Sequence, residues 1–374
     1  MIKKRILFLT GTRADFGKLK SLIEITRNSK LFDVHIFATG MHLQNKYGYT
    51  VNEIVKCNYD NIYKFINHTS EESMDLTLAK TIQGLSNYIR EFKPKLIIVH
   101  GDRVEALAGA IVGSLNNILV SHIEGGEISG TIDELIRHSV SKMSHTHFVS
   151  NAIAKQRLIQ MGEIEKSIYE IGSPDVDLMF SKELPSLNEA KNHYNILFNR
   201  YAILMFHPVT TDLENMKDYA DNLVNAVMKS GLNFVVVYPN NDLGSSILLK
   251  AFEKFKNNTK FKIFPSISFE YFLVLLKNSD FIIGNSSAGI REAPSYGLPT
   301  INIGNRQHNR SSSKDIINCD YTLDEIIKAI NKAKKLELHA VNEYGHGRSD
   351  ELFLKILASN NFWNTDNQKT FIDL

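Results

Sequence analysis

The sequence predicts an α/β protein built from two doubly wound, Rossmann-like domains that face a cleft. Short, continuous apolar runs recur along the chain and are separated by segments with helical periodicity. Strands of this kind, alternating with helices, are typical of a parallel sheet covered on both faces. At 374 residues the chain also exceeds the size at which a single core usually stops growing, which indicates two domains.

Composition narrows the class of protein. Hydrophobic residues make up 43% and charged residues 22%, which is ordinary for a globular protein, and the net charge of +2 favours neither a nucleic-acid nor a membrane partner. The two cysteines, Cys57 and Cys319, indicate a reducing compartment rather than a disulfide framework. The apolar run Ile6–Leu9 is too short for a signal peptide, and no run reaches membrane-spanning length. We therefore expect a cytoplasmic protein.

The first half of the chain alternates regularly between the two kinds of element. The segment GTRADFG after the first strand is the kind of turn where backbone N–H groups favour an anion, and the polar, aromatic segment 40–50 suits a substrate lid. Strands are predicted at Arg5–Thr10, Val34–Ala38, Leu96–His100, Ile118–His122 and Thr146–Ser150, and helices from Lys18, over Glu71–Arg90 and Glu105–Leu115, from Asp133, and over Ala152–Met161.

The alternation breaks between Gly172 and Asn188, where two prolines interrupt any period, and we place the domain linker there. The predicted domains are residues 1–174 and 175–374, with the last helix crossing back to the first domain. Strands are predicted again at Ile203–Phe206, Phe234–Tyr238, Phe261–Phe264, Phe281–Gly284 and Thr300–Ile303.

The chemistry is predicted to centre on residues 122–138, HIEGGEISGTIDELIRH. A buried strand ends there, a glycine pair follows, and four carboxylates fall within eleven positions before a helix: Glu124, Glu127, Asp133 and Glu134. Open α/β sheets bind ligands at this kind of strand end. A helix capped by Thr131 or Asp133 with solvated acids is the alternative, but it does not account for Glu124 directly against a buried strand.

Three further strand ends are polar in the same way. His100-Gly101-Asp102-Arg103 follows one strand, His207-Pro208 another, and Ser286-Ser287 opens a helix that contains Arg291 and Glu292. Each alone has an ordinary explanation, such as a serine N-cap or, for Arg13, a surface arginine. Together they place carboxylates in the first half and phosphate-type donors in the second, which predicts a phosphorylated ligand on one side and acid/base chemistry on the other.

A metal site is the competing interpretation of the histidines. His122, Glu124, His138, His145 and His147 have ligand-like spacings. His145 and His147, however, begin an apolar strand, and neither cysteine is near, so a site without metal is favoured.

These motifs together resemble the UDP-N-acetylglucosamine 2-epimerase family over nearly the whole chain. GTRADFGKL, GDR at 101–103, HIEGGEISGTIDELIRH, HP at 207–208, NSSAGIREAPSYGLP and GNRQ occur in family order. The GGE-x-x-GTID-x-x-IRH form resembles the hydrolysing branch, since the HVEAGLR-like segment and PEE pair of the non-hydrolysing branch are missing. The resemblance implies a glycosyltransferase-B-type fold, no metal or other cofactor, and a homo-oligomer (a dimer or larger).

The resemblance also implies a mechanism, namely anti elimination of UDP to a 2-acetamidoglucal followed by addition of water. Carried over by motif, the acid/base carboxylates are Asp102, Glu124 and Asp133, with the order of their steps and the choice between Asp133 and Glu134 left open. His207 would lie beside the diphosphate. Phosphates would be held by Arg13, Arg103, Ser286, Ser287 and Arg306, and the ribose hydroxyls by Glu292.

Several alternatives for the activity stay open. The substrate is UDP-N-acetylglucosamine, giving N-acetylmannosamine for sialic acid biosynthesis, or its 2,4-diacetamido-2,4,6-trideoxy analogue for legionaminic-type acids. A pocket separates such small groups by only ~1–3 kcal/mol unless it hydrogen-bonds them. The competing functions are a non-hydrolysing 2-epimerase, a retaining glycosyltransferase and a sugar-nucleotide-binding regulator without turnover.

Overall fold

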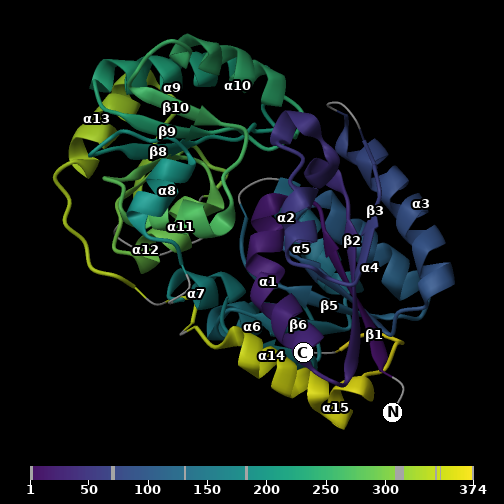
Figure 1. The fold of residues 1–374 in the computed structure, drawn as a ribbon. Coiled ribbons are helices and arrows are strands. Elements are labelled where there is room, and N and C mark those ends of the chain that lie inside the picture. The colour runs from purple at the N-terminus through teal and green to yellow at the C-terminus, as the bar shows by residue number, and fades with distance from the viewer. Residues whose placement is uncertain are drawn as a thin grey trace. The chain divides into compact units, whose positions relative to one another are not determined.

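A computed structural model describes residues 3–68, 72–129, 132–181, 184–307, 316–341, 343–345 and 347–372. The chain forms two compact units, one from residues 1–128, 133–181 and 344–374 and the other from residues 129–132 and 182–343. Each unit contains one parallel sheet with helices on both faces (Figure 1). No helix in the described residues is long and apolar enough to cross a membrane.

The first unit is organised around a sheet of seven strands in the order β3-β2-β1-β4-β5-β6-β7, all parallel. β4 and β5 are fully buried, and β1 is buried from Ile6 onward, because these largely apolar strands face helices on both sides. The strands are β1 (Lys4–Thr10), β2 (Phe32–Ala38), β3 (Asn61–Lys64), β4 (Leu96–His100), β5 (Leu119–Ile123), β6 (Thr146–Val149) and β7 (Ile168–Glu170).

Helices from both ends of the chain cover this sheet. α1 packs against α7 and α14, and α3 packs against α4. The helices are α1 (Arg13–Asn28), α2 (Val51–Lys56), α3 (Met74–Phe92), α4 (Val104–Leu115), α5 (Ile132–Met143), α6 (Ala152–Gln160), α7 (Pro174–Met179), α14 (Ser349–Ala358) and α15 (Asn360–Trp363).

The C-terminal helices α14 and α15, yellow in Figure 1, complete the first unit. Phe353 of α14 enters the core, where its ring lies 4.7 Å from that of Phe148 and 6.5 Å from that of Phe8. The Asp177 carboxylate accepts hydrogen bonds from the amides of Ser349 (2.9 Å) and Asp350 (3.0 Å) and so caps α14. Burial raises the pKa of Asp177 to about 6.

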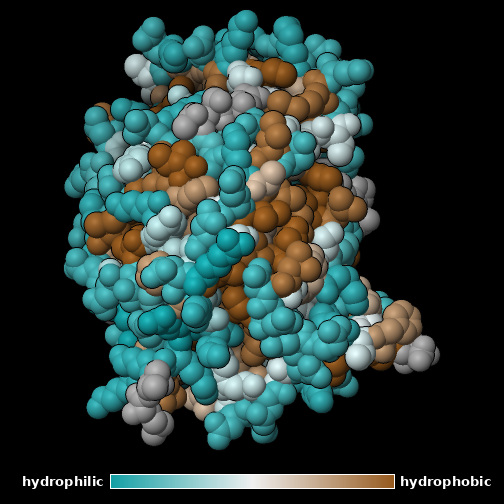
Figure 2. All heavy atoms as spheres, turned by 90° about the vertical axis from the view of Figure 1, so that its right-hand side faces the viewer, coloured by the Kyte–Doolittle hydropathy of each residue, from teal (hydrophilic) through white to brown (hydrophobic). Residues whose placement is uncertain are grey.

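Figure 2 shows the side of the first unit that carries α3 and α4, where hydrophobic residues gather in a diagonal band. Leu76 at the start of α3 and Leu115 at the end of α4 are exposed by half or more. Single apolar residues are common on protein surfaces, so the band rather than either leucine distinguishes this side.

The second unit repeats the architecture with a parallel sheet in the order β10-β9-β8-β11-β12-β13. Its core is rich in phenylalanine, and the rings of Phe234 and Phe261 stack at 5.7 Å. The strands are β8 (Ala202–Met205), β9 (Phe234–Val237), β10 (Phe261–Phe264), β11 (Ile282–Gly284), β12 (Thr300–Ile303) and β13 (Ile316–Cys319), and the helices are α8 (Leu187–His193), α9 (Met216–Ser230), α10 (Ser245–Phe252), α11 (Phe269–Lys277), α12 (Glu292–Ser295) and α13 (Leu323–Ala333).

The structure corrects several expectations about local structure. The helix predicted from Lys18 begins at Arg13, because Thr12 and Asp15 form a capping box. The helix predicted after Ser286 is only the 3₁₀ turn Ser287–Gly289 followed by the four residues of α12. The predicted linker contains α7, which belongs to the first unit. Segment 40–50 forms two 3₁₀ turns with His42 and Tyr47 buried, so it is packed into the unit rather than free as a lid.

One glycine beside the second sheet has no tolerated substitute. Gly284 ends β11 with φ +140°, and a Cβ there would lie 1.8 Å from the carbonyl oxygen of Met205 on the neighbouring strand. We expect Gly284→Ala to lower the free energy of unfolding of this unit by ~3 kcal/mol or more, because both backbone strain and a backbone clash result. Gly231→Ala, at φ +69° with only the Lys260 Nζ atom nearby, is the matched control and should cost about 1 kcal/mol. Urea denaturation measures both, and equal losses would contradict the prediction.

Candidate active site

The polar groups of both units gather at the carboxyl ends of parallel strands. In each sheet the strand order reverses at one place, between β1 and β4 in the first unit and between β8 and β11 in the second. Doubly wound sheets bind ligands outside such reversal points. Asp102 follows β4, and His207 follows β8, so the sequence-predicted residues lie where the fold favours a site.

Glu124 is the residue whose backbone is most constrained. It follows β5 with φ +66°, a left-handed conformation that costs a residue with a side chain on the order of 1 kcal/mol. Its N–H donates to the Phe148 carbonyl (3.1 Å), and its own carbonyl accepts from Arg137 Nη1 (2.6 Å). Both backbone groups are therefore fixed, and the turn at Glu124 is held by neighbours on β6 and α5.

The Glu124 carboxylate is buried among donors. Its Oε1 atom lies 3.1 Å from His100 Nε2 and 3.8 Å from Lys18 Nζ, and it accepts from Ser173 Oγ at 3.4 Å. Lys18 is itself buried and lies 3.2 Å from Asp175 Oδ2. A buried carboxylate needs such partners, because an unpaired charge away from water is strongly unfavourable.

Arg137 connects the carboxylate of Asp102 to the backbone carbonyl of Glu124. Its guanidinium, 2% exposed, donates through Nη1 to the Glu124 carbonyl and through Nη2 to Asp102 Oδ2. Asp133 lies one helical turn earlier on α5, and a spacing of four residues places it on the same face as Arg137. The structure therefore brings Asp102, Glu124 and the predicted α5 carboxylate to one end of the first sheet.

The two arginines of the first unit that are predicted to hold phosphates have partners of their own. Arg13 Nη2 is ion-paired with Glu53 of α2. Arg103 precedes α4, and its Nε atom lies 3.3 Å from the buried carboxylate of Glu105. That carboxylate packs against Gly11, where a Cβ would lie 2.9 Å from Glu105 Cδ.

The half-buried Asp15 of α1 and the buried His42 of segment 40–50 lie 3.9 Å apart beside the β1–α1 turn. The Asp15 carboxylate accepts from the Gly11 and Thr12 amides (3.0 and 3.2 Å) and from Thr10 Oγ1. Burial raises the pKa of Asp15 despite these bonds. Burial and the nearby charge of Arg13 lower the pKa of His42 to about 3, so His42 is neutral at neutral pH.

In the second unit, Asn285 organises the strand ends. Its side chain accepts from the His207 N–H (2.7 Å) and donates to the His207 carbonyl (2.9 Å), bridging β8 and β11. The His207 ring accepts from the Asn240 amide at Nδ1 (3.0 Å). A neutral ring held in this way carries its proton on Nε2, which leaves that nitrogen as a donor.

The remaining predicted residues of the second unit surround Asn285 in sequence or in space. Ser286 caps the 3₁₀ turn by accepting from the Ala288 amide (3.3 Å), and Ser287 begins that turn. Arg306 Nη1 donates to the Asn285 carbonyl (3.2 Å). Glu292 is 2% exposed on α12. Thus the structure brings His207, Ser286 and Arg306 together through Asn285, which the sequence did not single out.

The histidines considered as metal ligands have other partners. His122 lies 2.8 Å from the Gly101 carbonyl through Nε2 and 3.0 Å from Ser141 Oγ through Nδ1. His147 pairs with Glu163, His138 with Glu134, and His145 with the Asn367 carbonyl. Within the part of the chain that the structure describes, no three His, Cys, Asp or Glu side chains are grouped as a metal site would require.

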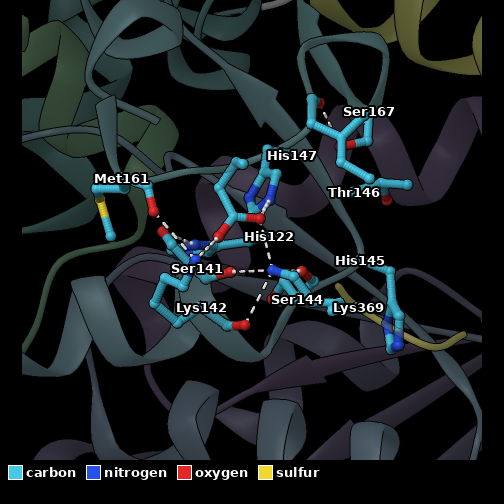
Figure 3. Close-up of polar contacts among 12 residues, drawn as sticks. His122, Ser141, Lys142, Ser144, His145, Thr146, His147, Met161, Ser167 and Lys369 are labelled. Carbon is cyan, nitrogen blue, oxygen red and sulfur yellow. Dashed lines mark hydrogen bonds and ion pairs between the residues drawn. The ribbon is translucent and has the colours of Figure 1, made fainter. Parts of the chain in front are cut away.

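A buried polar cluster supports the C-terminal end of α5 (Figure 3). Glu163, at 4% exposure, is ion-paired with Lys142 (2.8 Å) and Lys369, and its Oε2 atom lies 3.0 Å from His147 Nε2. Burial alone would raise the pKa of Glu163, but the hydrogen bonds from His147, Lys142 and Lys369 outweigh it and lower the pKa to about 2. Glu163 is therefore ionised throughout the neutral and mildly acidic range.

Four residues of the site carried no recognisable sequence signal of their own. Lys18 lies on a helix, and Asp175 lies in the segment predicted to be a linker. Asn285 directly precedes the two serines that were predicted to bind phosphate. Arg137 lay within the central motif, but only its i+4 spacing from Asp133 could have indicated its position.

The Glu163 cluster predicts a pH dependence of stability. The folded pKa of about 2 lies below the ordinary value of 4.5, so the stabilising contribution is complete above pH 4.5 and is lost as the pH falls towards 2. We expect the free energy of unfolding to fall over this window by up to roughly 3 kcal/mol from this group. Glu163→Gln should flatten the profile in urea denaturation, whereas Glu165→Gln at the exposed neighbouring site should not. A profile unchanged by Glu163→Gln would contradict the assignment.

Comparison with known proteins identifies the family. Residues 24–358 match the family model described as UDP-N-acetylglucosamine 2-epimerase. The chain is 48% identical to the UDP-N-acetylglucosamine 2-epimerase of Neisseria meningitidis serogroup B, over 99% of both chains. It is 34% identical to the UDP-N,N'-diacetylbacillosamine 2-epimerase (hydrolyzing) of Legionella pneumophila, over 96% of both.

Structural similarity agrees with this. The crystal structure of the Methanocaldococcus jannaschii UDP-GlcNAc 2-epimerase in complex with UDP-GlcNAc and UDP superposes with a TM-score of 0.82 at 24% identity, covering 94% of this chain and 99% of that one. This likeness confirms the predicted fold of two doubly wound domains of the glycosyltransferase-B type. The chain belongs to the UDP-N-acetylglucosamine 2-epimerase family.

Proposed function

We propose that the protein is a hydrolysing UDP-N-acetylglucosamine 2-epimerase that converts its substrate and water to N-acetylmannosamine and UDP. The observation that carries the proposal is Arg137, which bonds the Asp102 carboxylate and the backbone carbonyl of Glu124 and lies one turn from Asp133 on α5. Epimerisation at sugar carbon 2 requires removal and return of a weakly acidic proton, and a set of fixed carboxylates suits that task.

The first unit would act on the sugar. In the elimination step a base takes the proton from carbon 2 while the bond from carbon 1 to the UDP oxygen breaks, giving the 2-acetamidoglucal. In the hydration step water adds to carbon 1 and a proton returns to carbon 2 from the opposite face. Asp102, Glu124 and Asp133 are the proposed acid/base groups, and the open space beside Gly101, where a Cβ would meet nothing within 4 Å, leaves room for a ring.

The second unit would hold UDP. The Nε2–H of His207 is a donor suited to the diphosphate, since Nδ1 already accepts from Asn240. Ser286 and Ser287 offer hydroxyls beside it, Arg306 a positive charge, and Glu292 a carboxylate for the ribose hydroxyls. Arg13 and Arg103 of the first unit are proposed as further phosphate contacts.

The hydrolysing branch is supported by the GGE-x-x-GTID-x-x-IRH motif and by the name of the Legionella relative. Incubation with UDP-N-acetylglucosamine alone separates the alternatives. Free UDP together with N-acetylmannosamine supports the proposal, and a UDP-linked epimer indicates the non-hydrolysing reaction. No reaction without an acceptor indicates a glycosyltransferase, and binding alone a regulator.

UDP-N-acetylglucosamine is proposed as the substrate because the relative at 48% identity carries that name, whereas the one named for the diacetylbacillosamine sugar is 34% identical. The two sugars differ at carbons 4 and 6. Comparing kcat/KM on both sugar nucleotides tests this choice, and preference for the 2,4-diacetamido substrate would reverse it.

The three carboxylates should not be equivalent. Glu124→Gln keeps the shape of the side chain and removes its proton-transfer capacity, so a loss of ~10²–10⁴-fold in kcat is expected. Asp102→Asn and Asp133→Asn should also lose activity, and at least one of the three variants should accumulate, or fail to consume, the 2-acetamidoglucal. Product formed in deuterated water should carry deuterium at carbon 2. A product without it would exclude the elimination route.

Ser287 should contribute to UDP affinity without taking part in the chemistry. Removing one hydrogen bond to a charged phosphate is expected to raise the UDP dissociation constant by about threefold or more. Calorimetric titration of Ser287→Ala with UDP measures this. Ser279→Ala, a buried serine whose hydroxyl donates to the Leu276 carbonyl, is the control. Unchanged affinity in Ser287→Ala would remove this residue from the site.

A further inference from the structure

We propose that Lys369 is a positioning residue that caps the C-terminal end of α5 and thereby holds Asp133 and Arg137 in place at the other end. The inference rests on the proposed function for its activity readout. Lys369 itself lies far along the chain from every residue of the site, in the segment that follows α15.

The contacts of Lys369 are those of a helix cap. Its ammonium donates to the carbonyl oxygens of Ser144 (2.7 Å), Lys142 (2.9 Å) and Ser141 (3.4 Å), as Figure 3 shows. The last carbonyls of a helix have no partner within the helix, and a cation there also complements the helix dipole. α5 thus receives its C-terminal cap from a distant part of the chain.

The ammonium is fixed from the opposite side by Glu163. This carboxylate accepts from Lys369 and from His147 Nε2 (3.0 Å), which belongs to β6. His147 has no exposed surface, and burial lowers its pKa, so it donates as a neutral ring. Neighbouring contacts hold the same segment, because the Asn367 carbonyl accepts from His145 Nε2 (3.1 Å) and the Asn367 side-chain amide donates to the Asn117 carbonyl (3.0 Å). The position of Lys369 is therefore defined by the sheet.

One face of α5 carries, at each helical turn, a residue of the proposed site or a residue that contacts it. Asp133, Arg137 and Ser141 are spaced by four residues and lie on one face. Arg137 donates to Asp102 and to the Glu124 carbonyl, and Ser141 hydrogen-bonds His122. A helix is stiff along its axis, so displacement of its C-terminal turn moves Asp133 and Arg137 as well, and a misplacement of about 1 Å can cost ~10²-fold in rate.

Lys142 provides a matched control. It is also paired with Glu163 (2.8 Å) and donates to the Met161 carbonyl (3.1 Å), but it does not cap the α5 carbonyls. Lys369→Met and Lys142→Met therefore each remove one cation from Glu163, and only the first removes the cap.

The decisive readout is the partition ratio, the number of 2-acetamidoglucal molecules released per molecule of product. This ratio is a property of the folded enzyme and does not change with the fraction of protein that is folded. We expect Lys369→Met to raise it at least about fivefold, because a misplaced Asp133 or Arg137 affects the two steps unequally. Lys142→Met should change it by less than about twofold, and Lys369→Arg, which keeps the charge and the donors, should restore it.

Amide hydrogen exchange tests the position of α5 without any measurement of activity. The amides from Ile136 to Val140 should exchange faster in Lys369→Met than in Lys142→Met. A wild-type enzyme without turnover would refute the proposed function but leave this comparison intact. If exchange in these amides is the same in both variants, or if the partition ratio of an active Lys369→Met enzyme is unchanged, Lys369 does not position α5.

Discussion

The first unit depends on holding a buried carboxylate in a fixed place at the end of a strand. Glu124 occupies a left-handed conformation, its two backbone groups are hydrogen-bonded to Phe148 and Arg137, and its carboxylate lies close to His100 and Lys18. A buried carboxylate is tolerated only where several polar partners converge, and here they come from α1, from β4 and from Ser173 directly before α7. The positions of these elements are therefore coupled through one side chain, which explains why the site is assembled from segments far apart in the sequence.

The second unit aligns its polar groups through an amide. Asn285 connects His207 to Arg306 by amide and carbonyl hydrogen bonds. The resulting set of donors and a cation suits the proposed binding of the diphosphate by this unit, because a diphosphate is attracted by donors and cations. The contrast between the units is thus electrostatic, although their sheets share one topology.

The sequence predicted the buried strands better than it predicted the edge strands and the helix starts. The buried strand Leu96–His100 is an almost continuous apolar run, and its bounds were predicted correctly. Other buried strands, such as β5, were predicted to within one or two residues of their bounds. The edge strands β3, β7 and β13 were missed because they are only three or four residues long and partly polar. The start of α1 was placed five residues late because the capping box of Thr12 and Asp15 was not used.

For the site, the sequence indicates some residues and not the residues that contact them. Asp102, Glu124 and Asp133 could be proposed from the sequence because each follows a strand or opens a helix, which are positions that a sequence pattern marks. Lys18 and Asp175 could not, since each is defined only by the distance between them, 3.2 Å across segments more than a hundred residues apart. A local sequence pattern indicates where strands end. The residues that pair with a buried charged group are brought together by the tertiary fold, so a local pattern does not indicate them.

His122 has the sequence spacing of a functional residue, but its contacts in the structure are structural. Its spacing from Glu124 is that of a metal ligand, yet both ring nitrogens are engaged, with the Gly101 carbonyl and with Ser141. Burial lowers its pKa to about 3, so it stays neutral and keeps one donor and one acceptor in fixed directions. It therefore connects α5 to the turn that carries Asp102, in parallel with Arg137. Because His122 and Arg137 both connect α5 to the strand ends, a shift of α5 along the sheet would disturb both contacts. Such a shift would therefore displace Asp133 relative to Asp102.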